Sequence, residues 1–196
     1  METVATEIIP QHVLSFGLDQ EFFAVNVKNV IEIIEVPKVS KIPKAPSYMV
    51  GVINVRNHMV PLVDTRVKLG MADTNFTVDT CVIVVEIHAN GQRLAVGILV
   101  DEVLEVLDLN TDEVRPAPKF ETNEYERFIT GMFPVEERFA MILDLDQIFS
   151  LSEIIQLETI SQDELSNMEP KEGQTKEGAP LQKSSPMTQT EKQKKS

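Results

Sequence analysis

A 14-residue segment occurs twice in the chain, and this duplication restricts the possible fold more than any other feature of the sequence. Residues 51–64 (GVINVRNHMVPLVD) align without a gap on residues 131–144 (GMFPVEERFAMILD), at a constant offset of 80 residues. Glycine, valine and aspartate coincide at 51/131, 55/135 and 64/144, and both copies carry charged residues at the centre. One such match could arise by chance between two apolar segments, so the order of further matches decides the interpretation.

Two more pairs of segments keep the same order along the chain. Ala24-Val25 recurs as Ala95-Val96, and residues 30–33 (VIEI) recur as residues 103–106 (VLEV), at offsets of 71 and 73 residues. An ordered series with nearly equal spacing is typical of an internal duplication. We therefore predict two five-stranded units, at about residues 13–70 and 80–150. Each unit of roughly 60 residues is too small to bury much apolar surface alone, so we expect the two to pack together with a crevice between them.

Short alternating runs of β-branched and aromatic residues predict a mostly β fold. Strands are expected at 13–18, 21–27, 52–55, 59–64, 81–87, 93–100, 103–107 and 139–143. Helical turns are expected at 28–34 and 65–69, and one longer helix over 145–157 (LDQIFSLSEIIQL), capped by Asp144 or Asp146. Two small barrels, closed or nearly closed, would leave few exposed strand edges.

Composition and charge exclude several classes of function. Of the 196 residues 42% are apolar, which is enough for a core, and the net charge of -13 repels phosphate backbones and anionic lipid surfaces. We therefore expect no nucleic-acid partner and no direct membrane contact. The single cysteine and the absence of an apolar targeting segment favour the cytoplasm. Residues 166–196 are rich in Glu, Lys, Gln, Ser and Pro and are expected to be disordered, as a solvated tail or as a tether ending in EKQKK.

Residues that could carry catalysis are scarce. The three histidines, at 12, 58 and 88, show no zinc-ligand spacing, and Cys81 opens an apolar strand. We expect no metal, no cofactor and no catalytic residue. Three residues could be an exception, because each of them ends an apolar strand: Asp64, Asp101 and Asp144. Their carboxylates could meet around a divalent ion, or two of them could act as an acid and base pair. Capping is favoured, because Asp64 and Asp144 are copies that each precede a helical segment.

Several strings resemble the CheW coupling proteins of bacterial chemotaxis. They are EFFAVNVKNVIEIIEV, IPKAPSYMVGVINVRNHMVPLVDTRVKLG, RLAVGILVDEVLEVL, VRPAP, ITGMF and MILDLDQI. The resemblance covers about residues 12–150, and we expect a CheW-like domain over 12–157. The family's run from Pro43 to Asp64 has one departure, since Asn57 follows Arg56 where the family usually has glycine. Asparagine tolerates positive φ, so we expect the turn to survive.

The resemblance implies two SH3-like five-stranded barrels and an adaptor without enzymatic activity. Such an adaptor couples the cytoplasmic tips of chemoreceptors to the regulatory domain of the histidine kinase CheA. In the family the receptor binds between the barrels, and we expect a receptor helix there while an exposed apolar strand face of the second barrel contacts the kinase. The residues that match the family's interface positions are Val30, Glu32, Arg56, Asn57, Gly97, Val103 and Val106.

Two alternative functions remain open at this point. A CheW-like scaffold in a signalling array that controls pili or biofilm would share every feature above and differ only in its partners. A metal-dependent hydrolase would use Asp64, Asp101 and Asp144, and is the more distant alternative. A coupling module fused to a receiver domain is disfavoured, because too few residues follow the predicted barrels to form a receiver.

Overall fold

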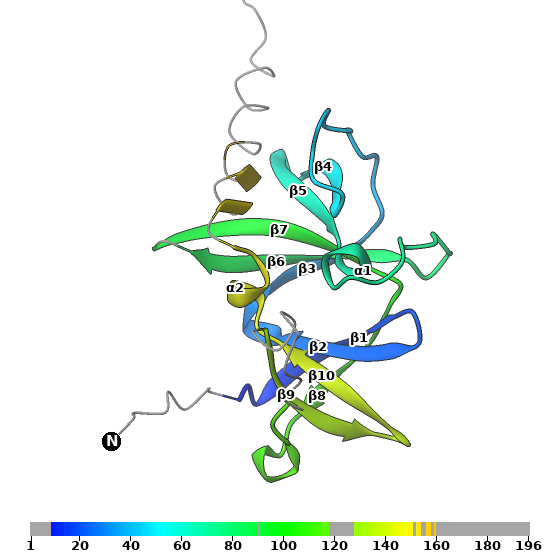
Figure 1. The fold of residues 1–196 in the computed structure, drawn as a ribbon, viewed down its shortest axis with the longest axis vertical. Helices are drawn as coiled ribbons and strands as arrows, with labels where there is room; N and C mark the ends of the chain where they lie inside the picture. Colours follow the sequence, from blue (N-terminus) through cyan, green and yellow to red (C-terminus); the bar gives the residue numbers. More distant parts are fainter. Residues whose placement is uncertain are drawn as a thin grey trace, which may run out of the picture.

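Two five-stranded β-sheets, stacked one above the other in Figure 1, make up the folded part of the chain. The computed structural model describes residues 9–89, 91–117 and 128–150, and residues 152, 153, 156, 157 and 159. Asn90, between the predicted strands 81–87 and 93–100, and the predicted tail at 166–196 lie outside these residues. The prediction of a mostly β fold built from two five-stranded units is confirmed.

The two sheets have equivalent strand orders. Sheet 1, in the order β3-β6-β7-β5-β4, consists of β3 (Val30–Glu35), β6 (Cys81–Ala89), β7 (Gln92–Val100), β5 (His58–Asp64) and β4 (Met49–Val55). Sheet 2, in the order β8-β1-β2-β10-β9, consists of β8 (Glu102–Asp108), β1 (His12–Leu18), β2 (Glu21–Asn26), β10 (Arg138–Leu143) and β9 (Ile129–Val135). The short helices are η1 (Val27–Asn29), α1 (Thr65–Lys68), η2 (Thr111–Glu113) and α2 (Leu145–Ile148).

The sheets do not coincide with the two halves of the chain, so the predicted division into 13–70 and 80–150 is wrong as a spatial division. The β1–β2 hairpin pairs with β8 and β10, and the β6–β7 hairpin pairs with β3 and β5. Each hairpin has therefore joined the last three strands of the other half. The copies carry the same apolar alternation, so either hairpin suits either sheet, and the repeat alone does not distinguish the two arrangements.

The duplicated segments 51–64 and 131–144 form equivalent hairpins, β4–β5 and β9–β10. In sheet 1, Ser40 and Val52 exchange two backbone hydrogen bonds, and in sheet 2 Arg115 and Met132 do the same. The glycine beside each bridge leaves room for this contact. A Cβ on Gly51 would lie 2.3 Å from the carbonyl oxygen of Ser40, and its φ of 150° is itself unfavourable for other residues.

The largest apolar core lies between the two sheets. It includes Phe16 and Phe23 from sheet 2 together with Ile83 and Ile98 from sheet 1, all almost fully buried. Smaller cores lie inside each sheet, around Leu62 and Leu99 in sheet 1 and around Phe133 and Ile142 in sheet 2. Since each fully buried apolar side chain contributes roughly 1.5–3 kcal/mol, the shared core holds the two sheets together as one unit.

Two of the predicted helical segments differ from the structure. Residues 28–34 were expected to form a helical turn, but only η1 is helical there and the β-branched run that follows it forms β3. The predicted helix over 145–157 is interrupted, because α2 ends at Ile148 and Phe149 has an extended backbone. The prediction of a short helix at 65–69 is confirmed by α1.

A second helical segment begins after the interruption, and its described residues are 152, 153, 156, 157 and 159. The backbone N–H of Ser150 donates to the Glu153 carboxylate over 2.7 Å, and the N–H of Glu153 donates to the Ser150 hydroxyl over 3.4 Å. This reciprocal pattern is a capping box. The Ser-x-x-Glu spacing was visible in the sequence, and would have placed a helix start inside the predicted helix.

Candidate protein-interaction surfaces

Arg56 and Asn57 form the tight turn of the β4–β5 hairpin. Both have positive φ, 49° and 68°, as a two-residue turn between twisted strands requires. The side chain of Asn54 accepts a hydrogen bond from the backbone N–H of Asn57 over 3.0 Å. The turn therefore has the geometry expected with asparagine in place of glycine.

The turn brings Arg56 to Glu32 of β3. The Arg56 Nη2 donates to Glu32 Oε2 over 2.9 Å, and the side chain of Arg56 is 77% exposed while that of Glu32 is 18% exposed. Most N–H donors of the guanidinium are therefore free to meet a carboxylate on another protein. Ile31 and Ile33, which flank Glu32, are 52% and 45% exposed. Sequence reasoning missed this apolar edge because it took the segment for a helical turn.

The three valines of the predicted site lie on both sides of the boundary between the sheets. Val30 begins β3 in sheet 1, and Val103 lies on β8 in sheet 2, and both pack at the edge of the shared core. Val106, further along β8, is 57% exposed. It lines a mainly apolar pocket of about 430 Å³ whose walls also include Ile9, Pro10, His12, Val27 and Lys28. The space expected between the barrels is thus filled by the shared core, and the pocket lies at the end of sheet 2, beside β8 and η1.

Gly97 occupies a different environment from the other predicted site residues. It lies in the middle of β7, buried, and pairs with Leu62 and Val84. A Cβ at this position would lie 3.0 Å from Val82 Cγ1 and 3.2 Å from Leu62 Cδ1. Gly97 therefore shapes the core of sheet 1 and does not itself form part of an exposed surface.

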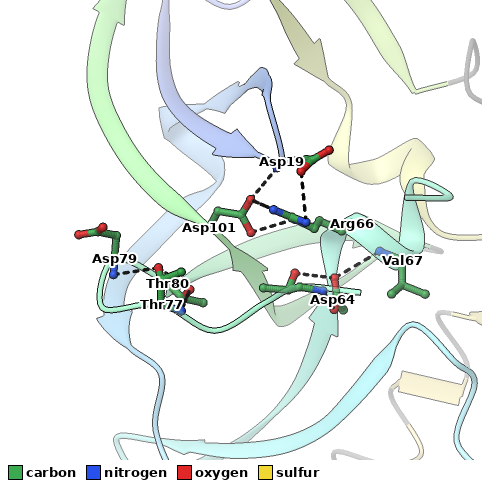
Figure 2. A network of polar contacts seen from close by, with 9 residues as sticks. Asp19, Asp64, Arg66, Val67, Thr77, Asp79, Thr80 and Asp101 are labelled. Carbon is green, nitrogen blue, oxygen red and sulfur yellow. Dashed lines mark hydrogen bonds and ion pairs between the residues drawn. The ribbon is translucent and has the colours of Figure 1, made fainter. Parts of the chain in front are cut away.

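Arg66 joins the two sheets through a cluster of charged groups (Figure 2). Its guanidinium donates to both carboxylate oxygens of Asp101, with Nε at 2.9 and 3.0 Å, and an Nη2 bond completes the contact. The Asp101 carboxylate also accepts the backbone N–H of Asp19 over 2.6 Å. Hydrogen bonding to Asp101 raises the pKa of Arg66 above its ordinary value. Because Asp101 is the residue between β7 and β8, this cluster holds the crossing from sheet 1 to sheet 2.

The three aspartates proposed for a hydrolase do not assemble into a metal centre. Asp64 caps α1 and accepts two hydrogen bonds from Thr74, while Asp101 binds Arg66. Asp144 caps α2, and burial raises the pKa of its carboxyl. In the part of the chain that the structure describes, no group of three His, Cys, Asp or Glu side chains is arranged to hold a metal ion. The capping interpretation is confirmed for Asp64 and Asp144, and the metal-centre interpretation is wrong.

A second ion pair connects sheet 1 to the segment that follows sheet 2, near the last residues that the structure describes. Lys68 of α1 donates to Glu153 over 2.6 Å, and its ammonium lies 4.6 Å from the ring centre of Tyr48 and 5.2 Å from that of Phe149. Burial disfavours ionisation of Glu153, but hydrogen bonds from Lys68 and Ser150 outweigh this and lower its pKa to about 2. The helical segment after Ser150 is thereby attached to sheet 1.

None of the helices that can be described here is both long and apolar enough to cross a membrane.

Comparison with known proteins gives the same family at the level of sequence and of structure. The family model described as CheW-like domain matches residues 12–153. The chemotaxis protein CheW of Klebsiella aerogenes is 32% identical over 158 residues, covering 81% of this chain and 93% of that protein. The chemotaxis protein CheW of Thermotoga maritima is 28% identical over 151 residues, covering 76% of this chain and 93% of that protein. The crystal structure of the scaffolding protein TtCheW from Thermoanaerobacter tengcongensis matches with a TM-score of 0.64 and 26% identity, covering 74% of this chain and 96% of that one.

Proposed function

We propose that this chain, which belongs to the family of CheW-like domains, couples the cytoplasmic tips of chemoreceptors to the regulatory domain of the histidine kinase CheA. Proteins of this family are non-enzymatic scaffolds of chemotaxis, and the chain is one of them. Such a role places the protein in the cytoplasm, where it would reach the membrane only through the receptor.

The receptor would bind at the open part of the boundary between the sheets. Val30 and Val103 present apolar surface from the two sides of that boundary, and Val106 continues it into the pocket of about 430 Å³. A receptor helix with an apolar stripe fits such a groove, because residues three and four apart in a helix lie on one face. The observation that carries the proposal is this mainly apolar pocket beside β8, together with Val30 and Val103 at the boundary between the sheets.

The kinase would bind outside the groove, on an apolar strand face of sheet 2. Leu104 of β8 is 41% exposed there, whereas its neighbour Val103 packs against the shared core. An interface of standard size buries roughly 800 Å² on each partner, so one small protein has surface for two such contacts. Both partners can then be bound at the same time.

Arg56 provides the sharpest test, because it is exposed and pairs with one side chain, Glu32, among the residues that the structure describes. Arg56→Glu is expected to leave the thermal melt nearly unchanged, since an exposed ion pair contributes about 0–1 kcal/mol. The same substitution should abolish co-sedimentation of the chain with receptor-bearing membranes and CheA.

A charge exchange separates an interface role from a structural one. The double variant Glu32→Arg with Arg56→Glu can re-form the intramolecular pair with its charges reversed. If the pair serves the fold, the double variant should behave like the natural protein. We expect it to fold and still to fail in co-sedimentation, and recovery of binding would contradict the interface role of Arg56.

A further inference from the structure

The pairing between β1 and β8 contains a β-bulge. Val103 lies opposite Phe16, and Val106 lies opposite Leu14. One residue of β1, Ser15, therefore lies opposite two residues of β8, and β8 holds one residue more than its partner over this stretch. A bulge changes which side chains share a face of the strand, and such bulges are common where a protein has to re-aim a side chain.

The bulge places two valines of the proposed receptor site on the same face of β8. In a regular strand, residues three positions apart lie on opposite faces, because successive side chains alternate. Val103 and Val106 are three positions apart, but their partners on β1 are two positions apart and both belong to the shared core. Val106 accordingly lines the pocket of about 430 Å³, and the next residue, Leu107, packs against the core inside sheet 2. Without the extra residue, one of the two valines would face that inner core.

The hydroxyl of Ser15 bonds to both backbone groups of one bulge residue. It donates to the carbonyl oxygen of Glu105 over 2.7 Å and accepts the backbone N–H of Glu105 over 3.2 Å. In the pairing of β1 with β8, Glu105 has no residue directly opposite it. A serine hydroxyl can donate one hydrogen bond and accept others, so a single side chain serves both groups.

The burial of Ser15 indicates that this hydroxyl has a purpose. Ser15 is 1% exposed, between the buried side chains of Leu14 and Phe16. Serine is mostly found at the surface, and a buried hydroxyl is costly unless it is hydrogen-bonded. Without the hydroxyl, the backbone groups of Glu105 would lose this partner, and the strand could recover the loss by giving up the bulge.

We propose that Ser15 is a positioning residue for the receptor site, because its hydroxyl fixes the bulge that puts Val103 and Val106 on one face of β8. This inference rests on the proposed function, in which the two valines contact the receptor helix. Ser15 itself is buried and acts through β8, without touching the receptor.

The test compares two substitutions of Ser15 that have nearly the same shape, in the full-length chain. Ser15→Thr keeps the hydroxyl, and Ser15→Val replaces it by a methyl group. We expect Ser15→Val to bind a purified receptor-tip fragment about tenfold or more weakly than Ser15→Thr does, as the loss of an important interface contact does. Val82→Ala, in the core inside sheet 1, is the control for lost stability, and should bind the fragment like the natural chain well below its melting temperature.

A thermodynamic cycle separates positioning from a general loss of stability. Val106→Ala should weaken receptor binding when it is combined with Ser15→Thr. It should have little further effect when it is combined with Ser15→Val, because Val106 has then already left the receptor face. Losses that add up in both combinations would contradict the positioning role.

The register of the unbound strands gives a result that needs no receptor. NMR contacts between Val106 and Leu14 should be present in the natural chain and in Ser15→Thr, and should be lost in Ser15→Val. Contacts that persist in Ser15→Val overturn the inference, whatever the binding result. Should Ser15→Val fail to fold, Ser15→Ala replaces it and is compared with the natural chain, because alanine adds no volume.

Failure of the proposed function has a different outcome. If the natural chain does not bind the receptor-tip fragment, or if Val106→Ala alone binds it equally well, the proposed receptor site is wrong. The NMR contacts then still decide whether Ser15 holds the bulge. If the natural chain binds, Val106→Ala binds weakly and Ser15→Val binds like Ser15→Thr, the receptor site stands and only the role of Ser15 is wrong.

Discussion

The ion pair between Lys68 and Glu153 should make the free energy of unfolding depend on pH between 4.5 and about 2. The pKa of Glu153 falls from an ordinary value of 4.5 to about 2 in the folded protein. A lowered pKa in the folded state means that the unfolded chain binds the proton more readily. The contribution to stability is therefore complete above pH 4.5 and is lost as the pH falls toward 2.

The size of the effect follows from the same values. Each pH unit of difference corresponds to about 1.4 kcal/mol, which gives about 3 kcal/mol for Glu153. The side chains of Lys68 and Glu153 are 13% and 22% exposed, so solvent reaches the pair in part. We therefore expect Glu153→Gln to lower the free energy of unfolding by about 2 kcal/mol at pH 7.

Urea denaturation at several pH values measures this contribution. The difference between the natural chain and Glu153→Gln should be constant from pH 7 to pH 5 and shrink below pH 4.5, since the Glu153 carboxyl of the unfolded chain then takes up a proton while the folded one stays ionised until about pH 2. Glu137→Gln, in the exposed turn of the β9–β10 hairpin, is the matched control and should change stability by less than about 0.5 kcal/mol. A Glu153→Gln effect that persists unchanged at pH 3 would refute the reasoning. So would a double-mutant cycle with Lys68→Met that gives no coupling.

Two further predictions concern the core and the length of the chain. Gly97→Ala should destabilise the protein by about 1–3 kcal/mol in urea denaturation, because its Cβ would crowd Val82 and Leu62, and unchanged stability would mean that these side chains move aside freely. A chain cut after Gln162 should fold and support receptor-dependent kinase activation like the full chain, and loss of activation in the reconstituted system would give the segment beyond that residue a function.

The strands of this protein were largely predictable because their apolar alternation is local. The duplication also predicted which strands are equivalent, and the Gly51 and Gly131 hairpins match in detail down to the bridge beside each glycine. The exchange of hairpins between the sheets was not predictable. It depends on where the chain crosses at η1 and Asp101, and the two copies present the same pattern at those points.

The residues that hold the sheets together were the least visible in the sequence. Arg66, Lys68 and Glu153 are charged residues in or near short helices, and such residues are usually solvated. Their partners lie 35 and 85 positions away along the chain, in the pairs Arg66–Asp101 and Lys68–Glu153. Only the capping box at Ser150 gave a local signal, and it predicts the helix start and not the contact with Lys68.

The two copies are alike in their apolar residues and differ in their charges, and a partner can distinguish the two sheets by these charges. Val30 and Val103 are copies of each other, so the two sides of the proposed receptor groove come from equivalent strands. Glu32 and Arg56 of sheet 1 correspond to Glu105 and Glu136 of sheet 2, where the like charges line a shared pocket and form no pair. A groove with nearly symmetric apolar walls would accept a helix in either direction. The charges differ between the sheets, because sheet 1 carries an Arg56–Glu32 ion pair where sheet 2 carries two carboxylates, and a charged partner can use that difference to select one sheet.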